Sequence, residues 1–282
     1  MSGPVVVGVD GSPSNLAVVE VAAREAERLG VGLELTQAVG WPSGAGRFAI
    51  PSWEAAGTGG HASTSGVLAE AERHARGAAP RVRISRGVLV GEPGTVLGGE
   101  SRTASLTVVG SDGARGHGSR RDGSLAGRLS ACVSGPLLVV RGRPNPVGAV
   151  LLVVHGASTL RGAAAFAFAE ASAHGVDLVA VRLRNASAAR PYGGSAQATA
   201  EDEEDLALAE ELSELRERYP DVTVRCRRPR GGARRALVEA SADSRLLVVG
   251  VRDRFRFARL PLDPVCQTAL HEADCPVALV RC

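Results

Sequence analysis

The chain has 282 residues, 44% of them hydrophobic, and a formal net charge of +3, which is enough for two globular domains that each bury a core. All 33 basic residues are arginine, and the absence of lysine excludes both a Walker-type P-loop and Schiff-base chemistry. The five cysteines form no C-x-x-C pair, which argues against a zinc site and a disulfide framework, and the scattered arginines give no support to nucleic-acid binding.

In the first half of the chain, apolar runs alternate with helical patterns. Near-continuous valine and leucine runs indicate strands buried on both faces, as in a parallel sheet covered by helices. The expected strands are 5–9, 33–39, 82–88, 106–109 and 137–140, and the expected helices are 14–29, 64–76, 94–102 and 124–133.

The second half repeats this order. Leu106 to Gly110 corresponds to Leu246 to Gly250, which indicates an internal duplication. The expected strands are 150–154, 176–181, 222–226, 246–249 and 277–280, and the expected helices are 160–174, 201–219, 233–242 and 262–273. The predicted fold is therefore α/β, with two doubly wound five-stranded parallel-sheet domains of strand order 3-2-1-4-5, at 1–142 and 147–282, joined by a Pro-bearing linker.

Two loops, Gly40 to Gly60 and Asn185 to Gln197, have no assigned role. Each follows the second strand of its half and is rich in Gly, Ser and Ala, so disorder is the simpler expectation.

A glycine and serine spacing follows the fourth predicted strand. Gly110 and Gly113 are separated from Gly123 and Ser124 by nine residues, and Ser124 opens the last helix of this half. Such a loop leaves backbone N–H groups that suit a phosphate. Taken singly, these glycines also fit a strand end, a turn and a helix start.

The first strand ends in Asp10, Gly11 and Ser12. With strand order 3-2-1-4-5, the ligand crevice lies between the first and fourth strands, so Asp10 is expected to face Gly110 across it. Alone, Asp10 would more simply be read as an N-cap of the following helix. Its coincidence with the glycine spacing favours a binding role.

These residues resemble the universal stress proteins, in the tandem form with two such domains. The pattern G-x2-G-x9-G-[S/T] of the family's nucleotide-binding members fits Gly110 to Ser124, and Val5 to Ser12 looks like the family's first strand. The resemblance implies a stress-linked regulatory domain that binds ATP, with or without Mg²⁺. AMP and ADP are the alternative nucleotides. The implied binding residues are Asp10, Gly11, Ser12, Ala38, Gly110, Ser111, Gly113, Gly123, Ser124 and Leu125.

The second half departs from this pattern. His155 stands in the place of Asp10, and the offsets of the phosphate loop hold Asp253, Asp263 and Pro264. Because the two aspartates put negative charge where phosphates would lie, this half is predicted to have lost the nucleotide. His155 is expected to be a packed or capping residue.

Three functions remain open: an ATP-binding regulator, a slow Mg²⁺-dependent ATP hydrolase, or a ligand-free interaction scaffold. No general base is identifiable, so at most a weak ATPase is expected, with no catalytic residue and no protein metal ligand assigned.

No apolar run approaches the roughly 20 residues of a membrane span, and a cytoplasmic location is expected. The degenerate half is predicted to serve as a pseudo-dimer partner through the fifth strands; a homodimer and an unidentified protein partner are further expectations.

Overall fold

The computed structural model of the chain describes residues 3–40, 64–111, 124–142, 147–155, 160–183, 208–227, 232–252 and 262–281. These residues form two compact units, which divide between Arg141 and Gly142, with Leu262 of the second half grouped with the first unit. The loop predicted at 40–60 lies outside the described residues except for Gly40, and the loop predicted at 185–197 lies wholly outside them. Within the described residues, no helix is both long and apolar enough to cross a bilayer.

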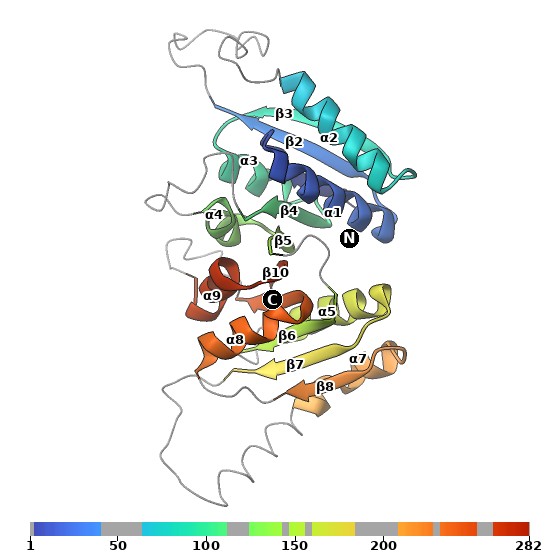
Figure 1. The fold of residues 1–282 in the computed structure, drawn as a ribbon, viewed down its shortest axis with the longest axis vertical. Helices are drawn as coiled ribbons and strands as arrows, with labels where there is room; N and C mark the ends of the chain where they lie inside the picture. The colour runs from blue at the N-terminus through green and yellow to red at the C-terminus, as the bar shows by residue number, and fades with distance from the viewer. Residues whose placement is uncertain are drawn as a thin grey trace, which may run out of the picture. The chain divides into compact units, whose positions relative to one another are not determined.

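The first unit is a parallel sheet with helices on both faces. Its elements are β1 (Val5–Gly8), α1 (Pro13–Leu29), β2 (Leu33–Val39), α2 (Thr64–Ala78), β3 (Ile84–Val90), α3 (Pro93–Glu100), β4 (Leu106–Gly110), α4 (Leu125–Cys132) and β5 (Leu137–Val140). The strand order is β3-β2-β1-β4-β5, with every pair parallel, as predicted. Helices α1 and α2 pack together on one face, in front of the strands in Figure 1, and α3 packs on α4 on the other.

The second unit repeats this plan. Its elements are β6 (Ala149–Val154), α5 (Leu160–His174), β7 (Leu178–Arg182), α7 (Ser213–Arg218), β8 (Val224–Arg227), α8 (Ala233–Ala242), β9 (Ser244–Val251), α9 (Pro264–Glu272) and β10 (Val277–Arg281). The order β10-β9-β6-β7-β8 is the same arrangement in the second copy, again with parallel pairs. The predicted fold class is confirmed in both units.

Helix α1 shows how local sequence sets the element ends. Ser12 is the N-cap, and Pro13 occupies the first helical turn, where a missing N–H costs nothing. Gly30 ends the helix in the left-handed region, at φ 67°, and its N–H donates to the carbonyl groups of Ala26 and Glu27. The helix therefore ends at the predicted residue and starts one residue before the predicted one.

Three predicted strands begin too early because the valine at each predicted start belongs to the turn before the strand. Val82 is 5% exposed, yet its N–H donates to the Ala79 carbonyl, and β3 begins only at Ile84. Val176 and Val222 likewise donate within turns that precede β7 and β8. At these positions the run of apolar residues thus starts before the hydrogen-bonded strand does.

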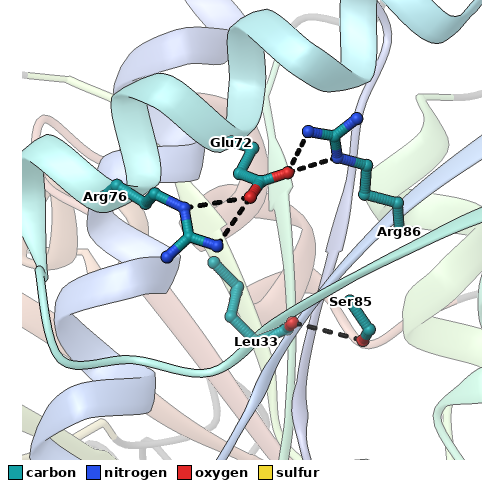
Figure 2. A network of polar contacts seen from close by, with 5 residues as sticks. All are labelled: Leu33, Glu72, Arg76, Ser85 and Arg86. Carbon is teal, nitrogen blue, oxygen red and sulfur yellow. Dashed lines mark hydrogen bonds and ion pairs between the residues drawn. The ribbon is translucent and has the colours of Figure 1, made fainter.

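A carboxylate of α2 fixes this helix over the edge strand β3. Oε1 of Glu72 accepts hydrogen bonds from Nε and Nη2 of Arg76, at 2.9 and 2.7 Å, and Oε2 pairs with the Arg86 guanidinium of β3. Figure 2 shows Glu72 between the two arginines, with Ser85 of β3 donating to the carbonyl of Leu33 on the adjacent strand. The hydrogen bonds from Arg76 and Arg86 hold the pKa of Glu72 below its ordinary value, despite an opposing effect of burial.

Candidate functional site

The first candidate element is the turn that joins β1 to α1. Oδ1 of Asp10 accepts hydrogen bonds from the N–H of Ser12, at 2.8 Å, and from its hydroxyl, at 2.7 Å. Gly11 between them has φ 76°, in the region that favours glycine. The two flanking side chains and the glycine together form a tight Asx turn at the carboxyl end of β1.

Asp10 does not cap α1, which was the alternative interpretation of this residue. The N-cap position belongs to Ser12, with φ −78° and ψ 149°. Within the described part of the chain, Oδ2 of Asp10 has no hydrogen-bond partner. One carboxylate oxygen therefore shapes the turn, while the other can accept a hydrogen bond from a ligand.

Asn15 supports this turn, and the sequence analysis missed it. It is 6% exposed, and its Nδ2 donates to the carbonyl of Gly8 at 3.0 Å, which ties the first turn of α1 to the end of β1. A buried amide among the apolar positions of α1 was the available signal, since buried polar groups need partners.

The sheet register places the ends of three strands at one level. Gly8 pairs with Thr36, and Val7 pairs with Val108. Continuing these registers puts Asp10 level with Ala38 and with Ser111, while Gly110 lies level with Val9. The expected partner of Asp10 across the crevice is thus shifted by one residue, from Gly110 to Ser111.

The N–H of Ser111 is already hydrogen-bonded within the sheet. It donates to the carbonyl of Val140 at 3.0 Å, continuing the β4–β5 ladder by one bond. Only the hydroxyl of Ser111 can therefore donate to a phosphate at this level.

The N-terminus of α4 supplies a second set of donors. Ser124 is its N-cap, and its hydroxyl oxygen accepts from the N–H of Gly127 at 3.1 Å. The N–H groups of Leu125 and Ala126 come before the first intrahelical bonds, so they point outward from the helix end. Gly113 and Gly123 of the predicted loop lie outside the described residues.

Arg128, a described cationic side chain of α4, pairs with a carboxylate of the neighbouring helix. Arg128 of α4 pairs with Glu92, the N-cap of α3, and Glu92 also accepts from the N–H of Thr95 at 3.0 Å. Burial raises the pKa of Glu92, but the N–H groups of Gly94 and Thr95 and the charge of Arg128 outweigh burial and lower it. The described donors toward a phosphate are therefore backbone N–H groups and hydroxyls.

The corresponding place in the second unit is filled by its own side chains. His155 follows β6, and its Nε2 lies 3.4 Å from Oδ2 of Asp263. Asp263 is the N-cap of α9, and its Oδ1 accepts from the N–H groups of Val265 and Cys266, both at 3.0 Å. The expectation that His155 is a packed residue fits its 12% side-chain exposure.

The charge of Asp263 is fixed at neutral pH. Burial raises its pKa, but hydrogen bonds from His155 and from Cys266 outweigh burial and hold the pKa far below its ordinary value. The helix end that would face a phosphate thus carries a carboxylate. Asp253, the second aspartate of the degenerate loop, lies outside the described residues.

The helix starts differ by one residue between the units. Val133 and Ala273 are corresponding C-caps, yet α4 begins at Leu125 and α9 begins at Pro264. Asp263 thereby occupies the place of Gly123, not that of Ser124. The earlier start brings its carboxylate to the end of β6.

The sequence model of the universal stress protein family matches residues 1–141 and 147–281. A universal stress protein of Mycobacterium tuberculosis is 31% identical over 303 residues, covering 98% of this chain and 94% of that protein. One from Mycolicibacterium smegmatis is 30% identical over 288 residues, covering 98% and 96%. The crystal structure of a universal stress protein from Archaeoglobus fulgidus has a TM-score of 0.69 at 15% identity, covering 100% of this chain and 97% of that one.

Proposed function

Because the chain belongs to the universal stress protein family as a tandem of two such domains, we propose that it is a stress-response regulator that binds one ATP, in its first domain. The supporting observation is the edge where Asp10 offers a carboxylate oxygen that no described residue binds, at the level of the Ser111 hydroxyl. A carboxylate suits ribose hydroxyls, and helix N-terminal N–H groups suit phosphates.

Each part of the proposed nucleotide is assigned to a protein group at this edge of the sheet. Oδ2 of Asp10 would accept from the ribose, and the backbone at Ala38 would border the adenine, since both lie at the same register level. The N–H groups of Leu125 and Ala126, with the Ser111 hydroxyl, would hold phosphate oxygens. Gly113 and Gly123 would let the intervening loop approach the phosphates closely.

The second domain is proposed to be empty of nucleotide. The carboxylate of Asp263 lies where an anion would sit, and His155 in place of Asp10 binds that carboxylate instead of a ribose. Repulsion between like charges in a partly buried site disfavours a phosphate there.

We also propose that the second domain is retained as a pseudo-dimer partner. In the strand order of the first unit, β5 is the last strand, and its sequence Leu137 to Val140 is entirely apolar. An apolar edge strand invites pairing, and a covalently linked homologue is present at high effective concentration. The fragment 1–142 should therefore form a homodimer in light scattering; a monomer of unchanged stability would contradict this proposal.

The identity of the nucleotide is tested by mass analysis of small molecules released when the purified protein is denatured. The expected result is ATP from the wild type and a strongly reduced amount from Asp10→Ala. AMP in place of ATP would revise the ligand. If no nucleotide is released and neither ATP, ADP nor AMP binds when added, the chain is a ligand-free scaffold.

A further inference from the structure

The second unit holds a compact set of three chemically different ligand groups. The imidazole of His155, the carboxylate of Asp263 and the thiol of Cys266 each offer an atom, and these atoms all lie within 4.8 Å of one another. They come from the end of β6 and the first turn of α9. Cys266 is 0% exposed, so this cluster is not a surface collection of polar groups.

The separation between His155 and Asp263 matches that of two ligands on one metal ion and is longer than that of a strong hydrogen bond. Nε2 of His155 and Oδ2 of Asp263 are 3.4 Å apart. A charge-assisted N–H···O⁻ bond is usually about 2.7–2.9 Å long. Two ligands on a tetrahedral zinc, with metal–ligand bonds of about 2.0–2.1 Å, are instead separated by about 3.4 Å.

The carboxylate is already oriented for this role. Oδ1 of Asp263 is held by the two N–H groups of Val265 and Cys266, which leaves Oδ2 directed at His155. Hydrogen bonds of this kind to the outer oxygen fix a metal ligand in place.

A second observation sets His155 apart from an ordinary packed histidine. Its Nδ1 is buried and has no hydrogen-bond partner among the residues that the structure describes. Buried side-chain nitrogens in folded proteins are normally satisfied, so the ring is only partly paired in the described structure. The side of the ring that faces Asp263 is Nε2, and this nitrogen is the one available to the cluster.

We propose that His155, Asp263 and Cys266 form a site for a divalent transition metal, with Zn²⁺ as the preferred ion. One imidazole nitrogen, one thiolate and one carboxylate suit zinc or cobalt, whereas magnesium and calcium select oxygen ligands. The thiolate and the carboxylate together balance the charge of a divalent ion, which limits the cost of burying it. Three protein ligands leave a fourth position for water.

This site is independent of the proposed nucleotide site in the first domain. It also revises the conclusion drawn from cysteine spacing: the absence of a C-x-x-C pair excludes zinc sites built on that motif, but not a site with one thiolate. His155 is far in the sequence from Asp263 and Cys266, and it meets them because α9 begins at the carboxyl end of the sheet.

Cobalt binding to the full-length, metal-free protein tests the proposal. Reduced wild-type protein should bind one equivalent of Co²⁺, with a thiolate-to-cobalt charge-transfer band and the intense visible bands of four-coordinate cobalt. Zn²⁺ should displace the cobalt, and excess Mg²⁺ should not. Absence of the thiolate band in the wild type would overturn the proposal.

Three variants locate the site. Cys266→Ser removes the sulfur with little change in size and should abolish the charge-transfer band. Asp263→Asn keeps an N-cap residue, so α9 should persist, and His155→Gln keeps a polar side chain. Each should weaken zinc binding by more than about tenfold, since even indirect partners of metal ligands contribute that much.

Matched controls remove an exposed cysteine in place of the buried one. Cys132→Ser and Cys226→Ser change thiols that are exposed in the structure, and both variants should keep the full cobalt spectrum. A spectrum lost in either control but kept in Cys266→Ser would place the metal elsewhere and contradict the assignment. Nucleotide binding should be the same in all five variants, which separates this test from that of the first domain.

Discussion

Oδ1 of Asp10 accepts hydrogen bonds from both the N–H and the hydroxyl of Ser12, at 2.8 and 2.7 Å. This double acceptance fixes the orientation of the carboxylate at the edge of the sheet. The side chain is therefore preorganised, and its second oxygen can bind a ligand with little loss of conformational entropy.

Replacing Asp10 by alanine should weaken nucleotide binding by about ten- to hundredfold, because a hydrogen bond to a charged group contributes about 1.5–3 kcal/mol. Isothermal titration with ATP measures the change. Asp243→Asn is the control, since Asp243 is an exposed residue at the C-terminal end of α8. Equal affinities of Asp10→Ala and wild type would remove Asp10 from the site.

Gly11→Ala should destabilise the first domain by about 1–2 kcal/mol, because a residue with a Cβ is strained at positive φ. The added Cβ would also lie 3.2 Å from Cγ2 of Val67. Gly99→Ala is the control, since a Cβ at Gly99 meets nothing within 4 Å and a helical position favours alanine. Thermal unfolding compares the two; equal melting temperatures would contradict the strain at Gly11.

Glu72→Gln should lower the melting temperature at neutral pH, because it removes the charge that joins Arg76 of α2 to Arg86 of β3. The folded-state pKa of Glu72 is lowered, so its stabilising contribution is present above the unfolded-state pKa. This contribution is lost as the pH falls through the folded-state value. The difference between variant and wild type should therefore shrink from pH 7 to roughly pH 3, where carboxylates become protonated.

Glu70→Gln provides the control on the same helix. Glu70 lies 3.8 Å from Arg73 in a pair whose side chains are 51% and 72% exposed, and such pairs contribute little. A shift as large as that of Glu72→Gln would show that the effect is not specific to the α2–β3 contact.

Asp263→Ala should destabilise α9 by about 1–2 kcal/mol, since the carboxylate caps two N–H groups that would be left unpaired. Asp263→Asn should retain most of this capping. Thermal unfolding checks the order of stabilities. A variant Asp263→Ala as stable as Asp263→Asn would show that the cap contributes little.

The strand order could be predicted because buried strands repeat in two copies with the same connections. The starts of β3, β7 and β8 could not, because Val82, Val176 and Val222 are apolar residues of turns, and hydropathy does not distinguish an apolar turn residue from the first residue of a strand.

The candidate site was only partly predictable. The position of Asp10 follows from the end of β1, but its bond to Ser12 depends on the turn conformation at Gly11. The contact of His155 with Asp263 joins distant segments and could not be predicted, although the earlier start of α9 has a sequence signal, an aspartate N-cap followed by Pro264 in the first turn.

The number of nucleotides bound per chain tests the central claim most directly. Isothermal titration of the nucleotide-free, full-length protein with ATP should give a stoichiometry near one, because only the first domain combines Asp10 with the complete glycine spacing. Asp10→Ala should weaken this single site, and Asp263→Asn should leave it unchanged. A stoichiometry near two would show that the second domain also binds nucleotide, and the absence of binding would contradict the proposed function itself.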